Sequence, residues 1–530
     1  MGGGGCHVCE YVKIEDRYGN LFNKPADGAF GEALVSQISP AFQLDGLYGI
    51  SDEKEFQLNE TGSGTQSVDD NGLMTVSSGI TGGSFATLRS KRSVRYRPGQ
   101  GSLARFTAMF PDSQVDGYQQ LAGFINQSDI LGVGFNYGDP TVFPQKRDEF
   151  AILRRQNSKA QVAQFTITNP SSGVETIRIT LDDVDFDVDI DAGNTSQNTA
   201  KLGNATYSGW IVDYYDNQLF FLFNGPPTPL PGVFSISNQT GGTLSGTYTP
   251  LQVGAAPNDN WSYQSDFNLD KLDGTGPSKM QIDPTQLNVF QIDFRWLGAG
   301  RIRYSIEDPA TGVLFPFHID LYANKNTQPS ISNPSLRVGY GVVNAAPTIG
   351  TGTDVEVKGA SMMGSIEGQV IRNTTTRAVS NDINNLSGSD YHHLLTLKNN
   401  RIILDGKPNV NNQRELILTS ISVSVNGSGS TDPIKILIYK NLASGDLDKL
   451  LTYTVIDSFG ACSKTSAEVI NPDLLQESVI GTFYVARDQT TTIDLLPLRI
   501  ILSPLEKVSL VQFCPSNTSG TGVAINFEVE

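Results

Sequence analysis

The chain is poor in cysteine, histidine and charge, and it has no long apolar run. Four cysteines in 530 residues are too few for a disulfide framework, which excludes the class of disulfide-stapled secreted domains. No segment approaches the ~20 consecutive apolar residues of a membrane-spanning helix, so we expect no membrane span. None of the four histidines lies near a serine or cysteine in a nucleophile elbow, which gives a hydrolytic triad little support.

The N-terminus, MGGGGCHVCEYVK, has neither the charged nor the apolar region of a signal peptide. This predicts synthesis in a cytosol. Cys6, His7 and Cys9 would bind zinc only with a fourth ligand, and a flexible tail is the favoured interpretation. Acylation of Gly2, together with Cys6, is the alternative. No cofactor is expected.

Positive charge is also scarce: the chain has 38 lysine and arginine residues against 55 aspartate and glutamate residues, and its formal net charge is -17. An acidic chain lacks the basic surface that phosphate backbones require, so nucleic acid is not an expected partner. Charged residues are only 18% of the total, whereas glycine (53) and proline (26) are plentiful. That composition favours short strands joined by tight turns over helices. We therefore predict an all-β fold of several antiparallel β-sandwich domains, jelly-roll or lectin-like, with an N-terminal arm.

The strand-like runs divide the chain into five parts. Residues 1–50 are predicted to be an arm that adds a strand to a neighbouring subunit's sheet. Residues 51–155 together with 285–370 are predicted to form a β-sandwich, interrupted by a small β domain at 156–284. A polar linker is expected at 371–384, and a C-terminal β-sandwich at 385–530.

The most ordered feature is the basic segment, residues 88–110, which reads LRSKRSVRYRPGQGSLARFTAMF. Alternation in a strand would place its first basic residues on one face and Leu88, Val94 and Tyr96 on the other. We expect a cationic face that pairs with an acidic surface, either residues 183–191 or a neighbouring subunit. The six basic residues are Arg89, Lys91, Arg92, Arg95, Arg97 and Arg105.

Six aspartates alternate with apolar residues between positions 182 and 191. Alternation would place Asp183, Asp185 and Asp187 on one strand face, about 7 Å apart in successive pairs. A straight strand cannot converge its own carboxylates on the 6 to 8 oxygens that calcium needs. A solvated edge strand is therefore the favoured interpretation, and a calcium site completed by neighbouring loops is the weaker one.

Two further kinds of site remain open. Flat aromatic rings suit sugar faces, and the candidates are Trp210, Tyr214, Tyr215, Trp261, Tyr263 and Trp296, although most strand aromatics belong to a core. Carboxylate pairs of the glycosidase kind are the other possibility, with Glu307 and Asp308 or Asp266 and Asp270 as candidates.

Several ordered motifs resemble a family of virion structural proteins, found in large DNA viruses of algae and protists and in some marine tailed phages. They are RYRPGQGSLARFTAMF, GFNYG with FAILRR, LDKLDGTGPSKMQIDPTQLNVFQIDFRWLGAG, IEDPATGVLFPFHIDLYAN and VEVKGASMMGSIEG, which span residues 85–370. The resemblance implies a central concanavalin-like or laminin-G-like sandwich with a small β insertion. It also implies a particle component with no catalytic residues.

We therefore expect a structural protein of a virus particle, at the capsid surface, a vertex, a fibre or an appendage. It would be made in the host cytoplasm, reside in the virion, and act with other virion proteins as a homo-oligomer. The alternative is an adhesin that attaches to host glycans. A polysaccharide-degrading enzyme is less favoured.

Overall fold

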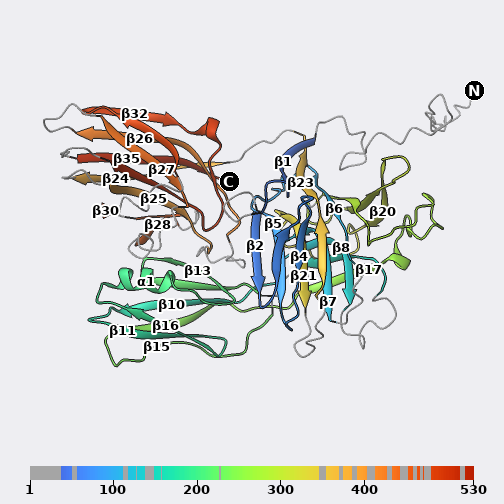
Figure 1. Ribbon diagram of the computed structural model, residues 1–530, viewed down its shortest axis with the longest axis horizontal. Coiled ribbons are helices and arrows are strands. Elements are labelled where there is room, and N and C mark those ends of the chain that lie inside the picture. Colours follow the sequence, from blue (N-terminus) through green and yellow to red (C-terminus); the bar gives the residue numbers. More distant parts are fainter. Residues whose placement is uncertain are drawn as a thin grey trace, which may run out of the picture.

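The computed structural model describes most of the chain after residue 37. The described ranges are 38–50, 56–111, 117–126, 128–137, 148–156, 158–225, 228–295, 297–344, 354–368, 374–384, 391–402, 412–426, 433–441, 452–457, 462–465, 469–470, 479–513 and 520–530. The fold is all-β, as predicted, and every strand pair among these residues is antiparallel. Figure 1 shows a sandwich on one side and two smaller β units stacked beside it.

The first unit, here the split sandwich, is built from two segments of the chain around one apolar core. Its six-stranded sheet has the order β1 (Ile38–Asp45), β23 (Ser361–Glu367), β6 (Ser102–Ala108), β18 (Asn288–Phe294), β19 (Ile302–Glu307) and β20 (Leu314–Asp320). Its seven-stranded sheet has the order β17 (Asn258–Tyr263), β9 (Ala151–Gln156), β8 (Ile130–Tyr137), β7 (Tyr118–Ile125), β21 (Val338–Asn344), β5 (Phe85–Ser90) and β2 (Phe56–Thr61). A small sheet of β22 (Glu356–Gly359), β4 (Met74–Ser77) and β3 (Thr65–Val68) covers one end.

The second unit, here the insert, runs from residue 162 to 252. One sheet contains β13 (Trp210–Tyr215), β14 (Gln218–Phe223), β10 (Val162–Asn169) and β16 (Ser245–Gln252); the other contains β12 (Val184–Ile190), β11 (Glu175–Leu181) and β15 (Phe234–Asn238). Helix α1 (Thr195–Gly203) was not expected. It begins with a capping box, in which the Asn194 side chain and Gln197 satisfy each other's main-chain N–H groups.

The third unit, here the C-terminal sandwich, has its own core. One sheet contains β24 (Thr375–Asn384), β35 (Gly520–Val529), β26 (Leu416–Asn426) and β32 (Gln489–Asp494), with β33 (Ile501–Leu502) beside β26. The other contains β28 (Tyr453–Asp457), β29 (Cys462–Thr465), β25 (Tyr391–Asn399), β34 (Lys507–Phe513), β27 (Ile434–Lys440) and β31 (Val479–Val485), with β30 (Val469–Ile470) beside β25. The short 3-10 helices are η1 (Gln264–Asp266) and η3 (Leu496–Leu498).

Three predicted boundaries were wrong. Strand β17 pairs with β9 along its whole length, with Arg155 bound to Asp259 through both carboxylate oxygens, so the insert ends before residue 258 rather than at 284. Residues 375–384 are not a linker, because they form β24, which pairs with all of β35. The sequence of β24 looks polar because this strand lies at a sheet edge, where it buries Val379 but exposes most of its other side chains.

The third wrong boundary concerns the arm. Residues 38–45 form β1, which pairs with β23 of the same chain instead of with a neighbour. Its buried residues Phe42 and Leu44 complete the core of the split sandwich, and this explains why the strand pairs within its own chain. Residues 1–37, which include Gly2, Cys6, His7 and Cys9, lie outside the described residues.

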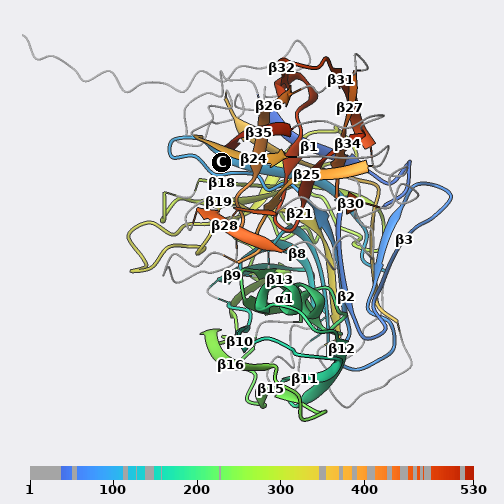
Figure 2. The same cartoon turned by 90° about the vertical axis from the view of Figure 1, so that its left-hand side faces the viewer.

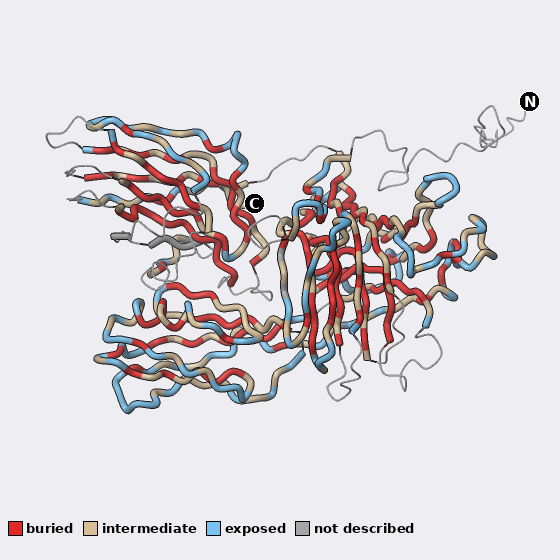
Figure 3. Tube along the Cα trace, viewed as in Figure 1, coloured by how far each residue is buried: buried red, intermediate tan, exposed pale blue. Residues whose placement is uncertain are grey.

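Each unit buries the apolar residues of its strands and exposes its loops (Figure 3). The core of the insert also includes Ile402, Leu437, Tyr439, Tyr453 and Val511 of the C-terminal sandwich. The two smaller units therefore share one continuous apolar contact, and Figure 2 shows them one above the other from a second direction. Among the described residues, no helix is long and apolar enough to cross a membrane.

Candidate functional site: the junction of the three units

The basic segment lies where the split sandwich meets the C-terminal sandwich. Lys91 Nζ is 3.1 Å from Glu506 Oε1. Arg97 forms an ion pair with the Glu530 side chain, and Arg95 donates to the main-chain oxygen of Glu530 and, at 3.0 Å, to that of Gln413. We call this set of contacts the basic clamp. It joins residues that are more than 300 positions apart in the chain.

The segment does not continue as a straight strand after β5. Strand β5 ends at Ser90, and only an isolated bridge between Val94 and Leu336 interrupts the irregular stretch before β6. The expected cationic strand face is therefore not formed, but Lys91 and Arg97 pair with acidic residues of the same chain, Glu506 and Glu530, rather than with residues 183–191. Arg105 differs from the others, because it lies in β6 and donates to Gln291 Oε1 at 2.7 Å inside the split sandwich.

Glu506 is the acidic centre of the basic clamp. Besides Lys91 it contacts Lys440 Nζ at 3.3 Å, and its second oxygen accepts from the Ser503 N–H at 2.8 Å. Burial alone would raise its pKa, but the two lysines and this hydrogen bond outweigh burial and lower it. Glu415 behaves in the opposite way: burial raises its pKa despite the nearby charges of Arg95 and Arg92.

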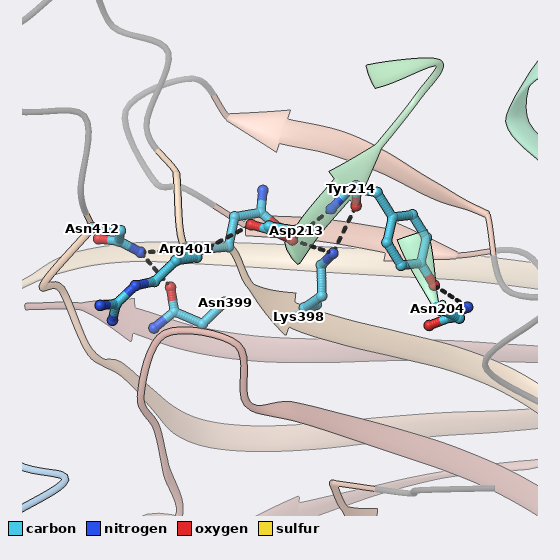
Figure 4. A network of polar contacts seen from close by, with 8 residues as sticks. Asn204, Asp213, Tyr214, Lys398, Asn399, Arg401 and Asn412 are labelled. Carbon is cyan, nitrogen blue, oxygen red and sulfur yellow. Dashed lines mark hydrogen bonds and ion pairs between the residues drawn. The ribbon is translucent and has the colours of Figure 1, made fainter. Parts of the chain in front are cut away.

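A second buried ion pair joins the insert to the C-terminal sandwich. Lys398 Nζ of β25 is 2.8 Å from Asp213 Oδ1 of β13, and the two side chains are 6% and 1% exposed. Lys398 also donates to the Tyr214 main-chain oxygen at 2.7 Å and lies 4.7 Å and 4.1 Å from the ring centres of Tyr214 and Tyr453. Figure 4 shows Asp213 between Lys398 and the main chain at Arg401, whose N–H donates to Asp213 Oδ2 at 2.6 Å.

Three arginines come together where all three units meet. Arg89 and Arg337 belong to the split sandwich and Arg401 to the C-terminal sandwich, and each is buried. Burial, followed by repulsion from Arg337, lowers the pKa of Arg89 and Arg401 to about 9. Arg89 and Arg401 line a cavity that also touches the insert at Ile211 and Asn224.

The candidate sugar-stacking residues are scattered and mostly packed. Trp210 lies half-buried in the insert, with its ring 5.3 Å from Phe223. Trp261 lies half-buried on the outward face of the seven-stranded sheet against Leu121, Ile125, Ile130 and Leu153. Tyr214, Tyr215 and Tyr263 are buried, and Trp296 lies outside the described residues.

The candidate calcium ligands already have partners within the insert. Asp182 and Asp183 form a two-residue turn, both with positive φ (53° and 66°), so Asp183 is not on the strand face. Arg178 binds Asp187 through two hydrogen bonds of 2.8 Å and contacts Asp185 at 3.1 Å. Strand β12 is an edge strand, and no group of three or more potential metal ligands gathers among the residues described.

The candidate carboxylate pairs hold loops in place. Asp270 accepts from the N–H groups of Leu272 and Ser278 at 2.9 and 2.8 Å. Asp308 likewise accepts from the Ala310 N–H at 2.9 Å. One carboxylate of each candidate pair is therefore engaged by nearby main-chain N–H groups.

Sequence reasoning missed Asp213, Lys398, Arg337 and Arg401. A signal was present for two of them, because Asp213 lies within the apolar run WIVDYY and Lys398 ends the run HHLLTLK. A charge inside an otherwise apolar strand indicates a buried, paired group. Nothing in the sequence indicated that these two charges pair with each other.

Comparison with known proteins finds no family model and no curated relative that matches the chain. Among solved structures, peanut lectin with a nine-residue peptide has a TM-score of 0.22 at 11% identity, covering 62% of this chain and 98% of that one. Lectin II from Ulex europaeus has a TM-score of 0.21 at 10% identity, covering 62% and 99%. The triple jelly-roll turret protein of an archaeal virus has 0.15 at 10%, covering 79% and 97%. Similarity at this level identifies neither a family nor a function.

Proposed function

We propose that the chain is a structural subunit of a virus particle, made in the host cytoplasm, that assembles as an oligomer with other virion proteins. The observation that carries the proposal is the interlocking of the three β units by buried ion pairs. The basic clamp fixes the C-terminal sandwich to the split sandwich, and the pair of Lys398 and Asp213 fixes it to the insert. Catalysis has no part in this proposal.

The interlocking supports a structural role because repeated assembly requires the same surface in every copy. Units that rotated freely relative to one another would present a different surface in each copy. Buried ion pairs between the units instead define one arrangement. The motifs that resemble virion structural proteins span residues 85–370 but leave out 162–252, so they fall on the split sandwich and not on the insert.

The C-terminal sandwich offers a surface for such assembly. Strand β31 is the edge of its sheet, and its Ile480 and Tyr484 are 43% and 62% exposed. Leu496 and Leu498 of η3 are 48% and 58% exposed. Apolar side chains on an unpaired edge strand favour contact with another chain.

Purified particles test the proposal directly. Mass spectrometry should detect the chain at a copy number that fits a symmetric position, and symmetry-resolved imaging should place its three units as one block. Replacing Tyr484 by Glu should lower the oligomer mass measured by light scattering, whereas Val184→Glu on the exposed face of the insert should not. Absence of the chain from particles would refute the proposal.

Carbohydrate binding is the second candidate function, and Trp261 is the observation that favours it. Its ring is half-buried on a sheet face next to a cavity, whereas the Tyr214 ring is covered by Lys398. Binding to a glycan array that is lost in Trp261→Ala and kept in Trp210→Ala would support this role. Equal binding by both variants and the parent would count against it.

A further inference from the structure

The cavity at the junction lies over the outward face of the seven-stranded sheet of the split sandwich. Its floor is formed by Leu121, Ile125 and Ile130, and its walls include Ile211 of the insert and Arg401 of the C-terminal sandwich. Its volume is about 80 Å³. A single water needs roughly 10–15 Å³ by this measure, so the cavity has room for a polyatomic ion or several waters.

Two cations in the cavity, Arg89 and Arg401, form no ion pair among the described residues, and the attraction of Asp213 for Arg401 is outweighed by burial and by repulsion from Arg337. Arg89 and Arg401 are 8% and 6% exposed, and within the described part of the chain the Nε atom of each is buried without a hydrogen-bond partner. Arg155, which also lines the cavity, is different because both oxygens of Asp259 bind it at 2.7 Å. Figure 4 shows the Arg401 side chain extending away from Asp213.

The nearby acids are engaged elsewhere. Asp213 binds Lys398, and Glu506 binds Lys91 and Lys440. Arg337 is attracted to Glu415 and Glu506, although burial still lowers its pKa, and it adds repulsion to Arg89 and Arg401. With pKa values of about 9, Arg89 and Arg401 remain charged at neutral pH. A buried, charged group without a partner is strongly unfavourable, and a bound anion removes that cost.

We propose that this cavity binds a small oxyanion, namely a carboxylate, sulfate or phosphate group, between the guanidinium groups of Arg89 and Arg401. Guanidinium groups present paired N–H donors that match two oxygens of such an anion. The apolar floor accommodates the rest of a small ligand, such as the ring of an acidic sugar. The site needs residues of two units and a wall from the third, so its occupation also stabilises their arrangement.

Binding can be measured on the full chain by calorimetry and by thermal unfolding, with sodium sulfate, inorganic phosphate, glucuronic acid and uncharged glucose as probes. Ionic strength is held constant with sodium chloride. We expect at least one anion to bind and to raise the unfolding temperature, and glucose to do neither. Tighter binding of glucuronic acid than of sulfate and phosphate would indicate an acidic sugar, and the reverse would indicate a free ion.

The variants Arg89→Met and Arg401→Met should each weaken anion binding at least tenfold, because each removes one of the two guanidinium groups. Arg178→Met, which removes a surface arginine of the insert, should leave binding unchanged and controls for the loss of charge alone. Arg401→Lys keeps the positive charge but lacks the paired N–H donors of the guanidinium group, and it replaces Arg401→Met in the test if that variant does not fold. The proposal is overturned if no anion binds the parent chain, or if Arg89→Met and Arg401→Lys bind as the parent does.

Discussion

The pair of Lys398 and Asp213 allows a quantitative test of the interlocking. In Lys398→Met the Asp213 carboxylate stays 1% exposed and loses its charged partner, but it keeps the N–H groups of Tyr214 at 2.9 Å and Arg401 at 2.6 Å. Removing one partner of a buried ion pair costs about 3–5 kcal/mol. Because two main-chain donors remain, we expect the lower end, about 3 kcal/mol, for the transition that separates the insert from the C-terminal sandwich.

Asp213→Asn should cost a similar amount, since it leaves Lys398 with the Tyr214 oxygen and two aromatic rings but no anion. The double variant leaves no unpaired charge, so its loss should be well below the sum of the two single losses. Contacting residues typically show interaction energies of about 0.5–3 kcal/mol in such a cycle.

Urea unfolding followed by tryptophan fluorescence measures these free energies through the midpoint and slope of each transition. Lys201→Met is the matched control: Lys201 is 3.2 Å from Asp191, but the two side chains are 36% and 73% exposed. An exposed pair of this kind contributes about 0–1 kcal/mol. A loss below about 1 kcal/mol in Lys398→Met, or simple additivity in the double variant, would refute the reasoning.

Three further predictions concern single sites. Arg97→Glu places two negative charges side by side at Glu530 and should make the connection between the two sandwiches more sensitive to protease, whereas Arg105→Gln should not; equal digestion patterns would contradict this. Asp183→Val places a β-branched residue at φ 66° and should cost about 1–3 kcal/mol in urea unfolding, whereas Asp183→Asn should cost less. Burial would raise the pKa of Glu175, but N–H donors including Leu244 (3.0 Å) and Thr243 (2.9 Å) outweigh burial and lower it to about 2. The stability from Glu175 is therefore present above pH 4.5 and lost as the pH falls from 4.5 towards 2, a dependence that Glu175→Gln should remove.

The role of the basic segment shows how a local pattern can be right while its partner is wrong. Six basic residues in an acidic chain indicated an electrostatic contact, and Lys91, Arg95 and Arg97 do make one. The expected partner, residues 183–191, instead pairs with Arg178 of the adjacent strand. Strands β11 and β12 are joined by a two-residue turn, so their register places Arg178 opposite Asp187, and Arg178 reaches these aspartates before any distant cation can.

The errors in unit boundaries have a similar origin. Residues 258–263 and 375–384 look polar because each strand lies at the edge of its sheet and exposes much of its surface. A sequence pattern reports burial, and an edge strand with few buried residues resembles a loop. Helix α1 was not predicted for a related reason: its buried residues are largely small or polar, so the sequence shows no apolar helical pattern there.

The sequence alone determined what depends on neighbours along the chain: the all-β class and the strand periodicity. These follow from steric preferences and from alternating burial, which act over a few residues. Only the tertiary structure decided which charges meet. Lys91 and Glu506 are 415 positions apart, and Asp213 and Lys398 are 185 apart. Such pairs depend on how the three units pack against one another, and so does the excess of positive charge at the cavity of Arg89 and Arg401.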